Sequence, residues 1–310
     1  MNILSWSKSV SFDAQKDIPP LNGKVILVTG GNIGLGKQSV LEFARHNPHQ
    51  IWLAARNPQR AQEAADEIRE IVPDAPIRLL ELDLSSFESI KKAVNTFLSQ
   101  SDRLDILMCN AGIMAAPAGL TRDGYEIQFG TNHLGHALLT KLLLPTLLRT
   151  AAMPDTDVRV ISLSSRGHTA WTNPGLRLDL VKTKAEELGG YTRYFQSKLA
   201  NVLWARQLAK EYPQLTVASI HPGVVQTGLM RGATGGSTVM TAFLKLATPF
   251  VRTVENGARN QLWASVSKDV TSGEYYEPVG VPDLASPQGK DDALAQVLWD
   301  WTQEELSKVR

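Results

Sequence analysis

The sequence predicts an α/β fold in which helices cover both faces of a doubly wound parallel sheet. Short, nearly continuous runs of Val, Ile and Leu alternate with longer segments that have helical spacing, which is the pattern of parallel strands buried on both faces. A glycine-rich turn directly follows the first of these runs, and right-handed crossovers then wind the helices around the sheet. We expect a single domain over residues 1–310, with residues 1–20 as an N-terminal extension.

Six apolar runs have the length and composition of strands; they cover residues 24–29, 50–55, 77–82, 104–109, 158–163 and 215–220. Segments with helical spacing lie between them, near residues 34–46, 58–72, 86–100, 123–150 and 191–212. Doubly wound sheets bind ligands at the carboxyl ends of their strands. The side chains that directly follow each strand are therefore the candidates for a functional site.

A Gly-rich stretch at residues 231–236 interrupts this alternation and precedes an apolar helix candidate at 239–251. The segment could be a lid over a substrate, or a surface loop beside an ordinary core helix. Its place after the sixth strand favours a lid, so we expect a substrate cap at about 225–255. Its apolar side chains suggest a bulky, largely apolar small-molecule substrate; they are Met230, Met240, Phe243, Leu246 and Phe250.

Composition gives little sign of a macromolecular or membrane partner. The formal net charge is +1 with 20% charged residues, so there is no electrostatic reason to expect nucleic acid or an anionic membrane surface. Cys109 is the only cysteine, which excludes an internal disulfide and suits a reducing compartment. Residues 1–20 contain no long apolar run, so we expect a cytoplasmic protein without a membrane span.

The turn at residues 29–37 reads TGGNIGLGK. Glycines allow a tight turn and a close approach to a pyrophosphate, and the following helix presents free N–H groups and the positive end of its dipole. The turn also fits the start of the phosphate loop of NTPases, which requires Ser or Thr where Gln38 stands; Ser39 comes one position late. The strand before and the helix after favour a dinucleotide instead.

Arg56 lies 20 positions after Gly36, at the end of the second expected strand. A carboxylate there would bind the ribose 2′-hydroxyl of NAD, whereas an arginine accommodates the 2′-phosphate of NADP. A guanidinium can pair with a phosphate through two hydrogen bonds. A solvated arginine at a strand end would look the same in sequence, but the glycine-rich turn upstream favours NADP.

Tyr194 and Lys198 are four residues apart and would share one face of a helix. A nearby ammonium group favours the phenolate and lowers the pKa of a tyrosine. Such a tyrosine can donate a proton to a carbonyl oxygen as a hydride arrives. Alone, this spacing is weak evidence, but polar or tight turns also follow three other strands, namely residues 110–112, 164–165 and 221–223.

Together these features resemble the short-chain dehydrogenase/reductase family, and within it the retinol-dehydrogenase-like branch, from about residue 21 onward. The motifs that carry the resemblance are TGGNIGLG at 29–36, DL at 83–84, NAG at 110–112, NHLGH at 132–136, SS at 164–165, YFQSKLAN at 194–201 and HPG at 221–223. The family's fold is Rossmann-type, in agreement with the pattern of strands and helices.

The resemblance implies four catalytic residues. Tyr194 would be the acid/base, Lys198 would lower its pKa and bind the nicotinamide ribose, and Ser165 would orient the substrate carbonyl. Asn132 would hold a water in a proton relay toward Lys198. Ser165 and Tyr194 are 29 positions apart, which is longer than in most of the family but familiar from this branch.

The resemblance also implies how NADP(H) binds. Asn32 and Arg56 would face the 2′-phosphate, Asp83 and Leu84 would meet the adenine, and residues 222–227 would cradle the nicotinamide. The complete implied set is Gly30, Asn32, Ile33, Gly34, Leu35, Gly36, Arg56, Asp83, Leu84, Asn110, Ala111, Gly112, Tyr194, Lys198, Pro222, Gly223, Val225 and Thr227.

The implied function is that of an NADP(H)-dependent oxidoreductase that reduces a carbonyl or oxidises the matching alcohol. The alternative is a non-redox NADP-binding regulator or scaffold with the same fold. The apolar face of residues 199–204 fits either a homodimer interface or the core of the monomer. His133 and His136 have a spacing that could hold a metal, but we expect packed or hydrogen-bonded histidines and no metal.

Overall fold

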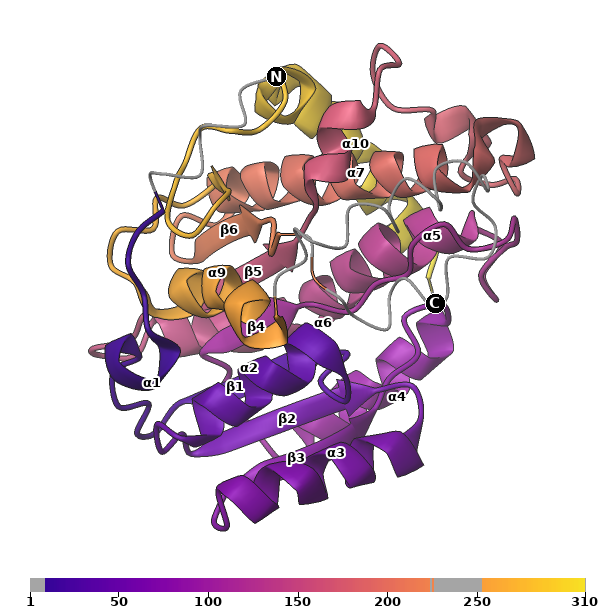
Figure 1. Ribbon diagram of the computed structural model, residues 1–310. Helices are drawn as coiled ribbons and strands as arrows, with labels where there is room; N and C mark the ends of the chain where they lie inside the picture. Colours follow the sequence, from indigo (N-terminus) through magenta and orange to yellow (C-terminus); the bar gives the residue numbers. More distant parts are fainter. Residues whose placement is uncertain (1–8, 224, 226–252, 310) are drawn as a thin grey trace.

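Seven parallel strands form one sheet in the order β3-β2-β1-β4-β5-β6-β7 in a computed structural model of the chain (Figure 1). The structure describes residues 9–223, 225 and 253–309. The expected helix at 239–251, Thr227 and the five apolar residues of the expected cap lie outside these residues. The doubly wound fold is confirmed.

The strands agree with the six apolar runs to within two residues at each end. They are β1 Val25–Thr29, β2 Gln50–Ala55, β3 Ile77–Glu81, β4 Ile106–Cys109, β5 Arg159–Leu163, β6 Thr216–Ile220 and β7 Tyr275–Tyr276. Leu27 in β1 is paired with Trp52 in β2 and Leu107 in β4. All three side chains are buried because helices cover both faces of the sheet.

Two layers of helices enclose the sheet (Figure 1). One layer packs with the core that contains Phe43 and Leu262, and consists of α1 Ala14–Asp17, α2 Gly34–Ala44, α3 Pro58–Ile71 and α9 Val254–Val266. The other packs with the core that contains Phe97 and Leu203, and consists of α4 Phe87–Leu98, α6 Gly135–Ala151, α7 Gly189–Glu211 and α10 Asp292–Ser307. Short 3₁₀ helices lie in the connections of the described part of the chain; they are η3 Arg166–Ala170, η4 Leu178–Leu180, η5 Glu186–Leu188 and η8 Gln288–Lys290.

The helix expected over residues 123–150 is divided. It begins with the short α5, Ile127–Phe129, continues as a π-helical turn, η2 Gly130–Leu134, and becomes regular at α6. Wide turns of this kind often occur at functional sites in helices. Asn132 lies within the π-helical turn, so its carbonyl is offset from the regular α-helical pattern.

The N-terminal extension packs against the domain in its described part. Phe12 and Ile18 are buried in the same core cluster as α9. The carbonyl of Phe12 accepts a hydrogen bond from Arg259 Nε at 2.5 Å. Residues 9–20 are therefore part of the folded unit.

Helices α9 and α10 and the two-residue strand β7 were not predicted. α10 lies along α7, where Asp292 pairs with Arg206 and Lys210. Leu199 and Leu203 on α7 are fully buried in the core cluster that also contains Leu298. Burial within the chain therefore accounts for the apolar face of α7.

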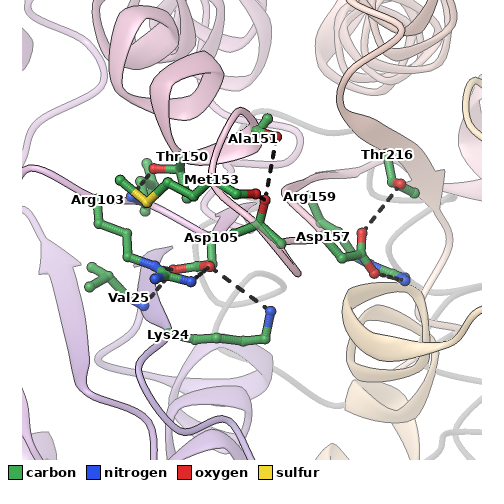
Figure 2. A network of polar contacts seen from close by, with 12 residues as sticks. Lys24, Val25, Arg103, Asp105, Thr150, Ala151, Met153, Asp157, Arg159 and Thr216 are labelled. Atoms are coloured by element: carbon green, nitrogen blue, oxygen red, sulfur yellow. Dashed lines mark hydrogen bonds and ion pairs between the residues drawn. The ribbon is translucent and has the colours of Figure 1, made fainter.

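A network of charged residues lies at the amino ends of the strands (Figure 2). Asp105 is fully buried, accepts the Val25 N–H at 2.9 Å and binds the Arg103 guanidinium through two oxygens. Arg159 is also buried and bonds to Asp157 and to the carbonyl of Ala264. These contacts link the amino ends of the strands, at the edge of the sheet opposite to the predicted site.

In the part of the chain that the structure describes, none of the helices has both the length and the apolar character that a bilayer span requires.

Candidate active site

The glycine-rich turn connects β1 to α2 at the carboxyl edge of the sheet. A Cβ at Gly36 would lie 2.3 Å from the Gly30 carbonyl oxygen and 2.5 Å from Nδ2 of Asn110. Only glycine fits at that position, because both neighbours are held by the fold. The turn and the end of β4 are thus packed directly against each other.

Asn110 holds the glycine-rich turn in place. Its Nδ2 donates to the Thr29 carbonyl at 2.7 Å, and its backbone N–H donates to Thr29 Oγ at 2.9 Å. The backbone N–H of Ala111 donates to the same hydroxyl oxygen at 3.0 Å. The Asn110 side chain therefore links the carboxyl ends of β1 and β4, and its amide nitrogen is already hydrogen-bonded within the protein.

The amino end of α2 has the features of an anion site. Ile33 stands at the N-cap without a side-chain hydrogen bond to the helix, and the first turn has no acidic residue. Free N–H groups and the helix dipole at such an end favour a phosphate. The Ile33 side chain is 52% exposed, and Asn32 is half-buried. The turn therefore fits the pyrophosphate of a dinucleotide.

Arg56 is exposed directly after β2. It makes no hydrogen bond or ion pair with any part of the chain that the structure describes, whereas Lys37 pairs with Glu67. After β3, half-buried Asp83 accepts hydrogen bonds from the backbone and hydroxyl of Ser85. Leu84 is buried. A cationic group and a polar turn thus follow adjacent strands, where the sequence predicts the adenosine half of the cofactor.

Tyr194 and Ser165 meet at the carboxyl end of β5. Tyr194 projects from α7 and is 5% exposed. Burial raises the pKa of its hydroxyl to about 12, and a hydrogen bond with the Ser165 side chain opposes this rise. The Ser165 hydroxyl also accepts the Gly167 N–H at 3.0 Å, which fixes its position at the start of η3.

Lys198 lies one turn further along α7. Its Nζ donates to the Leu163 carbonyl at 2.9 Å and stands 5.7 Å from the centre of the Tyr194 ring. Burial lowers the pKa of the Lys198 ammonium to about 8. The pKa of Tyr194 is therefore raised and not lowered as the sequence predicted, because removal of the phenolate from water dominates.

Asn132 completes the set of four predicted catalytic residues. Its side chain exchanges two hydrogen bonds with the backbone of Ile113, at 2.8 and 2.9 Å, and donates to Ser197 Oγ at 2.9 Å. A Cβ at Gly112 would lie 3.2 Å from Asn132 Oδ1 and 3.4 Å from Lys198 Nζ. The absence of a side chain at Gly112 therefore leaves room for both Asn132 and Lys198 beside this turn.

The turn after β6 closes the site. His221 is buried, Pro222 is half-buried and Gly223 adopts φ +90°. Val225 is 8% exposed. A Cβ at Gly257 in α9 would lie 2.4 Å from Val225 and 2.9 Å from Leu35, so α9, this turn and the glycine-rich turn pack closely.

Two supporting groups were missed by the sequence reasoning. Gln261 in α9 donates to Ser39 Oγ at 2.7 Å and lies 3.4 Å from Asn110 Oδ1. Arg193, which directly precedes Tyr194 in the sequence, forms a buried ion pair with Glu126 at 2.8 Å. The partners are far apart along the chain and lie in no local motif, so only the fold could reveal them.

His133 and His136 do not share a ligand position. His133 Nε2 lies 3.0 Å from Thr302 Oγ in α10, whereas His136 Nε2 lies 2.8 Å from Thr29 Oγ. The described residues contain no cluster of His, Cys, Asp and Glu that could hold a metal ion. Cys109 is buried, and burial raises the pKa of its thiol to about 12, so it is a packed residue.

Known proteins match this arrangement along most of the chain. A family model described as short chain dehydrogenase matches residues 24–169. The short-chain dehydrogenase/reductase drtF of Aspergillus calidoustus is 36% identical, over 94% of this chain and 96% of that protein. The chain belongs to the short-chain dehydrogenase/reductase family. Retinol dehydrogenase 13 of Homo sapiens is 36% identical over 89% of this chain and 82% of that protein.

A solved structure of an uncharacterized protein from Mycobacterium paratuberculosis shares the fold. It has a TM-score of 0.74 and 28% identity, and covers 96% of this chain and 98% of that chain. As a short-chain dehydrogenase/reductase, the chain is an oxidoreductase of a family that binds nicotinamide cofactors. The retinol-dehydrogenase-like resemblance is also confirmed by the relatives.

Proposed function

We propose that this short-chain dehydrogenase/reductase uses NADP(H) to reduce a carbonyl, or to oxidise the matching alcohol, with Tyr194 as the acid/base. The observation that carries the proposal is the meeting of Tyr194, Ser165 and Lys198 at one strand end. Asn132 stands beside them through the turn at Gly112.

Proton transfer follows from the state of Tyr194. With a pKa of about 12, its hydroxyl keeps the proton at neutral pH, so it can donate a hydrogen bond and then the proton to a carbonyl oxygen. Ser165 offers a second hydroxyl to the same oxygen as negative charge develops there. When bound at this site, NADPH would be the source of the hydride for the carbonyl carbon. Alcohol oxidation reverses these steps and requires the tyrosine to accept a proton.

Lys198 would lower the energy of the Tyr194 phenolate when cofactor and substrate are bound. Its ammonium is the cationic group beside the ring, and below about pH 8 it retains its charge. A positive charge at this distance stabilises a phenolate more strongly once water is displaced. We therefore assign to Lys198 the transient stabilisation of ionised Tyr194 and the binding of the nicotinamide ribose.

The preference for NADP over NAD is assigned to Arg56. Its guanidinium is exposed and is not engaged by any described residue, so it is available to a 2′-phosphate. Asn32 would share that phosphate, and the amino end of α2 would bind the pyrophosphate. Asp83 and Leu84 would border the adenine. Pro222, Gly223, Val225 and Thr227 would border the nicotinamide.

A bulky, largely apolar substrate completes the proposal. It rests on the apolar residues of the cap segment, which lie outside the described residues, and on the relatives named retinol dehydrogenases. The rival function is a regulator that binds NADP(H) without turnover. The presence of all four side chains of the catalytic set favours the enzyme.

The deciding experiment compares wild type, Tyr194→Phe and Tyr212→Phe with NADPH and with NADH over a panel of bulky aldehydes and ketones. Tyr212 lies at the far end of α7 and packs on Trp299, so its variant serves as the matched control. We expect NADPH oxidation by wild type and by the control, and a loss of at least about 100-fold in kcat for Tyr194→Phe. Full activity of Tyr194→Phe would refute the acid/base role, and NADPH binding without turnover on the entire panel would support the regulator.

A further inference from the structure

His136 lies behind the catalytic set and uses both ring nitrogens. It is buried, at 3% exposure. Nε2 stands 2.8 Å from Thr29 Oγ in the glycine-rich turn. Nδ1 stands 3.0 Å from the carbonyl oxygen of Asn132. One imidazole therefore bridges the predicted cofactor turn and a predicted catalytic residue.

The hydrogen-bond pattern around Thr29 fixes the tautomer of His136. Thr29 Oγ already accepts the backbone N–H groups of Asn110 and Ala111, at 2.9 and 3.0 Å. A hydroxyl has two acceptor lone pairs and one hydrogen, so its remaining role is to donate. Its nearer acceptor is His136 Nε2 at 2.8 Å, compared with 3.4 Å to the Met108 carbonyl. Nε2 therefore lacks a proton, and Nδ1–H donates to Asn132.

The imidazole remains neutral in this environment. Burial lowers its pKa to about 4, and the nearby positive charge of Lys198 acts in the same direction. His133, in the preceding π-helical turn, interacts electrostatically with His136. Burial lowers the pKa of His133 to about 3. A neutral ring of one tautomer has a fixed donor and a fixed acceptor. The positions of its two partners, Thr29 and Asn132, are therefore linked through the ring.

The Asn132 carbonyl stands where the helix departs from the regular α-helical pattern. It lies in the π-helical turn, where the N–H of Gly135 bonds to the carbonyl of Gly130. The Asn132 side chain is meanwhile engaged with Ile113 and Ser197. The His136 imidazole therefore orients the Asn132 carbonyl. The hydrogen bonds of the Asn132 side chain hold it beside the turn at Gly112, which borders Lys198.

We propose that neutral His136 is a positioning residue that couples the cofactor turn at Thr29 to Asn132 and, through Asn132, to Lys198 and Tyr194. This role rests on the proposed hydride transfer. It assigns two separable effects to one ring. The Nε2 contact orders the turn that binds the dinucleotide, and the Nδ1 contact holds the catalytic asparagine.

Two substitutions of His136 each retain one of its two hydrogen bonds and remove the other. In His136→Asn the amide nitrogen replaces Nδ1, which keeps the Asn132 contact and loses the Thr29 contact. In His136→Gln the longer amide reaches the place of Nε2, which keeps the Thr29 contact and loses the other. We expect His136→Asn to weaken NADPH binding by about five- to tenfold with kcat nearly unchanged. We expect His136→Gln to lower kcat by about tenfold with binding nearly unchanged, since one hydrogen bond is worth up to about tenfold.

His133→Asn is the matched control. It removes a histidine contact of the same type, to Thr302 in α10, and leaves the Thr29 and Asn132 contacts of His136 in place. We expect a lower melting temperature with unchanged kcat and unchanged NADPH affinity. A purely structural role for His136 would give the same pattern as this control, or equal losses in both parameters. Either result from the two His136 variants would overturn the proposal.

The tautomer can be tested without any variant or substrate. Long-range ¹H–¹⁵N spectra of the wild-type protein at pH 7 should show His136 neutral, with the proton on Nδ1. A proton on Nε2, or a cationic ring, would overturn the proposal. If wild type turns over no panel substrate, the proposed function fails, while the tautomer and the NADPH affinities of His136→Asn and His136→Gln still decide the positioning role. Loss of the affinity difference would then count against it.

Discussion

The Ser164 hydroxyl donates to the carbonyl of Lys198 at 2.7 Å. Ser164 is buried and is thus committed to the backbone of α7. Ser165, the next residue, is half-buried and has its hydroxyl beside Tyr194. Two adjacent serines therefore have different hydrogen-bond partners, because successive residues at the end of a strand point in opposite directions.

The two serines give a matched pair of substitutions. We expect Ser165→Ala to lower kcat on the order of 100-fold, because a donor to the developing oxyanion is lost. We expect Ser164→Ala to reduce the free energy of unfolding by about 1 kcal/mol with a small effect on kcat. Steady-state kinetics and urea unfolding measure the two effects. Reversal of the pattern would mean that Ser164, and not Ser165, contacts the substrate.

Arg56→Ala should change the cofactor preference. Loss of a charge-assisted pair with a phosphate weakens binding by about 10- to 100-fold, so NADPH affinity should fall and NADH affinity should not. Arg69→Ala is the control, since Arg69 lies on α3 and pairs with Asp66. Fluorescence titration with each cofactor measures the change. Equal weakening of NADH and NADPH would show that Arg56 does not recognise the 2′-phosphate.

Gly36→Ala should damage the dinucleotide turn. The added methyl group would lie 2.3 Å from the Gly30 carbonyl oxygen, so the backbone must shift. Overpacking of this kind costs about 1–3 kcal/mol of stability, and we expect NADPH affinity to fall with it. Gly119→Ala is the control, because its Cβ would meet only the Pro117 carbonyl at 3.9 Å. Normal NADPH binding by Gly36→Ala would contradict the assignment.

Stability should fall as the pH is lowered from about 6.5 toward 4. Burial holds the pKa values of His133 and His136 at about 3 and 4, below the ordinary value of 6.5. The unfolded chain therefore takes up protons first, so the stabilisation is complete above pH 6.5 and decreases below it. Each histidine contributes a slope of up to about 1.4 kcal/mol per pH unit in this range.

Urea unfolding at pH 7 and pH 5 measures this dependence. His133→Gln should make the decrease in stability less steep, since one histidine with a lowered pKa is removed while His136 and His168 remain. Glu305, whose pKa is lowered to about 2 mainly by Lys182 and Lys308 against the effect of burial, adds a loss of stability only below about pH 4.5. An unchanged free energy of unfolding between pH 6.5 and pH 5 would show that these histidines are not buried as neutral rings.

Asp105→Ala should destabilise the sheet and leave the chemistry intact. It removes the acceptor of the buried Val25 N–H and the partner of Arg103, at a cost of about 1–3 kcal/mol. The site lies at the other edge of the sheet, so kcat of the folded enzyme should be unchanged. Asp66→Ala, in an exposed pair, should change stability by less than about 1 kcal/mol. A change in kcat would place the network within the catalytic machinery.

The strands could be predicted because each is a continuous apolar run with turn residues on both sides. β7 could not, since two tyrosines form no pattern and become a strand only through pairing with β6. The division at Gly130–Leu134 was also hidden, because a single five-residue π-helical turn is too short to give a recognisable period of its own.

The motifs predicted that Ser165, Tyr194 and Lys198 would lie together, but they could not predict the electrostatics of these residues. Spacing places Lys198 near Tyr194, but the pKa of the tyrosine depends on burial by elements far away in the chain. The bridge from Thr29 to His136 joins residues 107 positions apart. No local pattern contains such a contact, and it becomes visible only when β1 and α6 lie side by side.

The packing of α10 on α7 has a consequence for biosynthesis. α7 carries Tyr194 and Lys198, but its outer face is covered by a helix that follows it by some 80 residues. A ribosome that has just completed α7 therefore releases a helix whose apolar side has no cover yet, and such surfaces aggregate readily. Until α10 has been synthesised, the apolar side of α7 that packs on it therefore stays uncovered, although α7 already carries Tyr194 and Lys198.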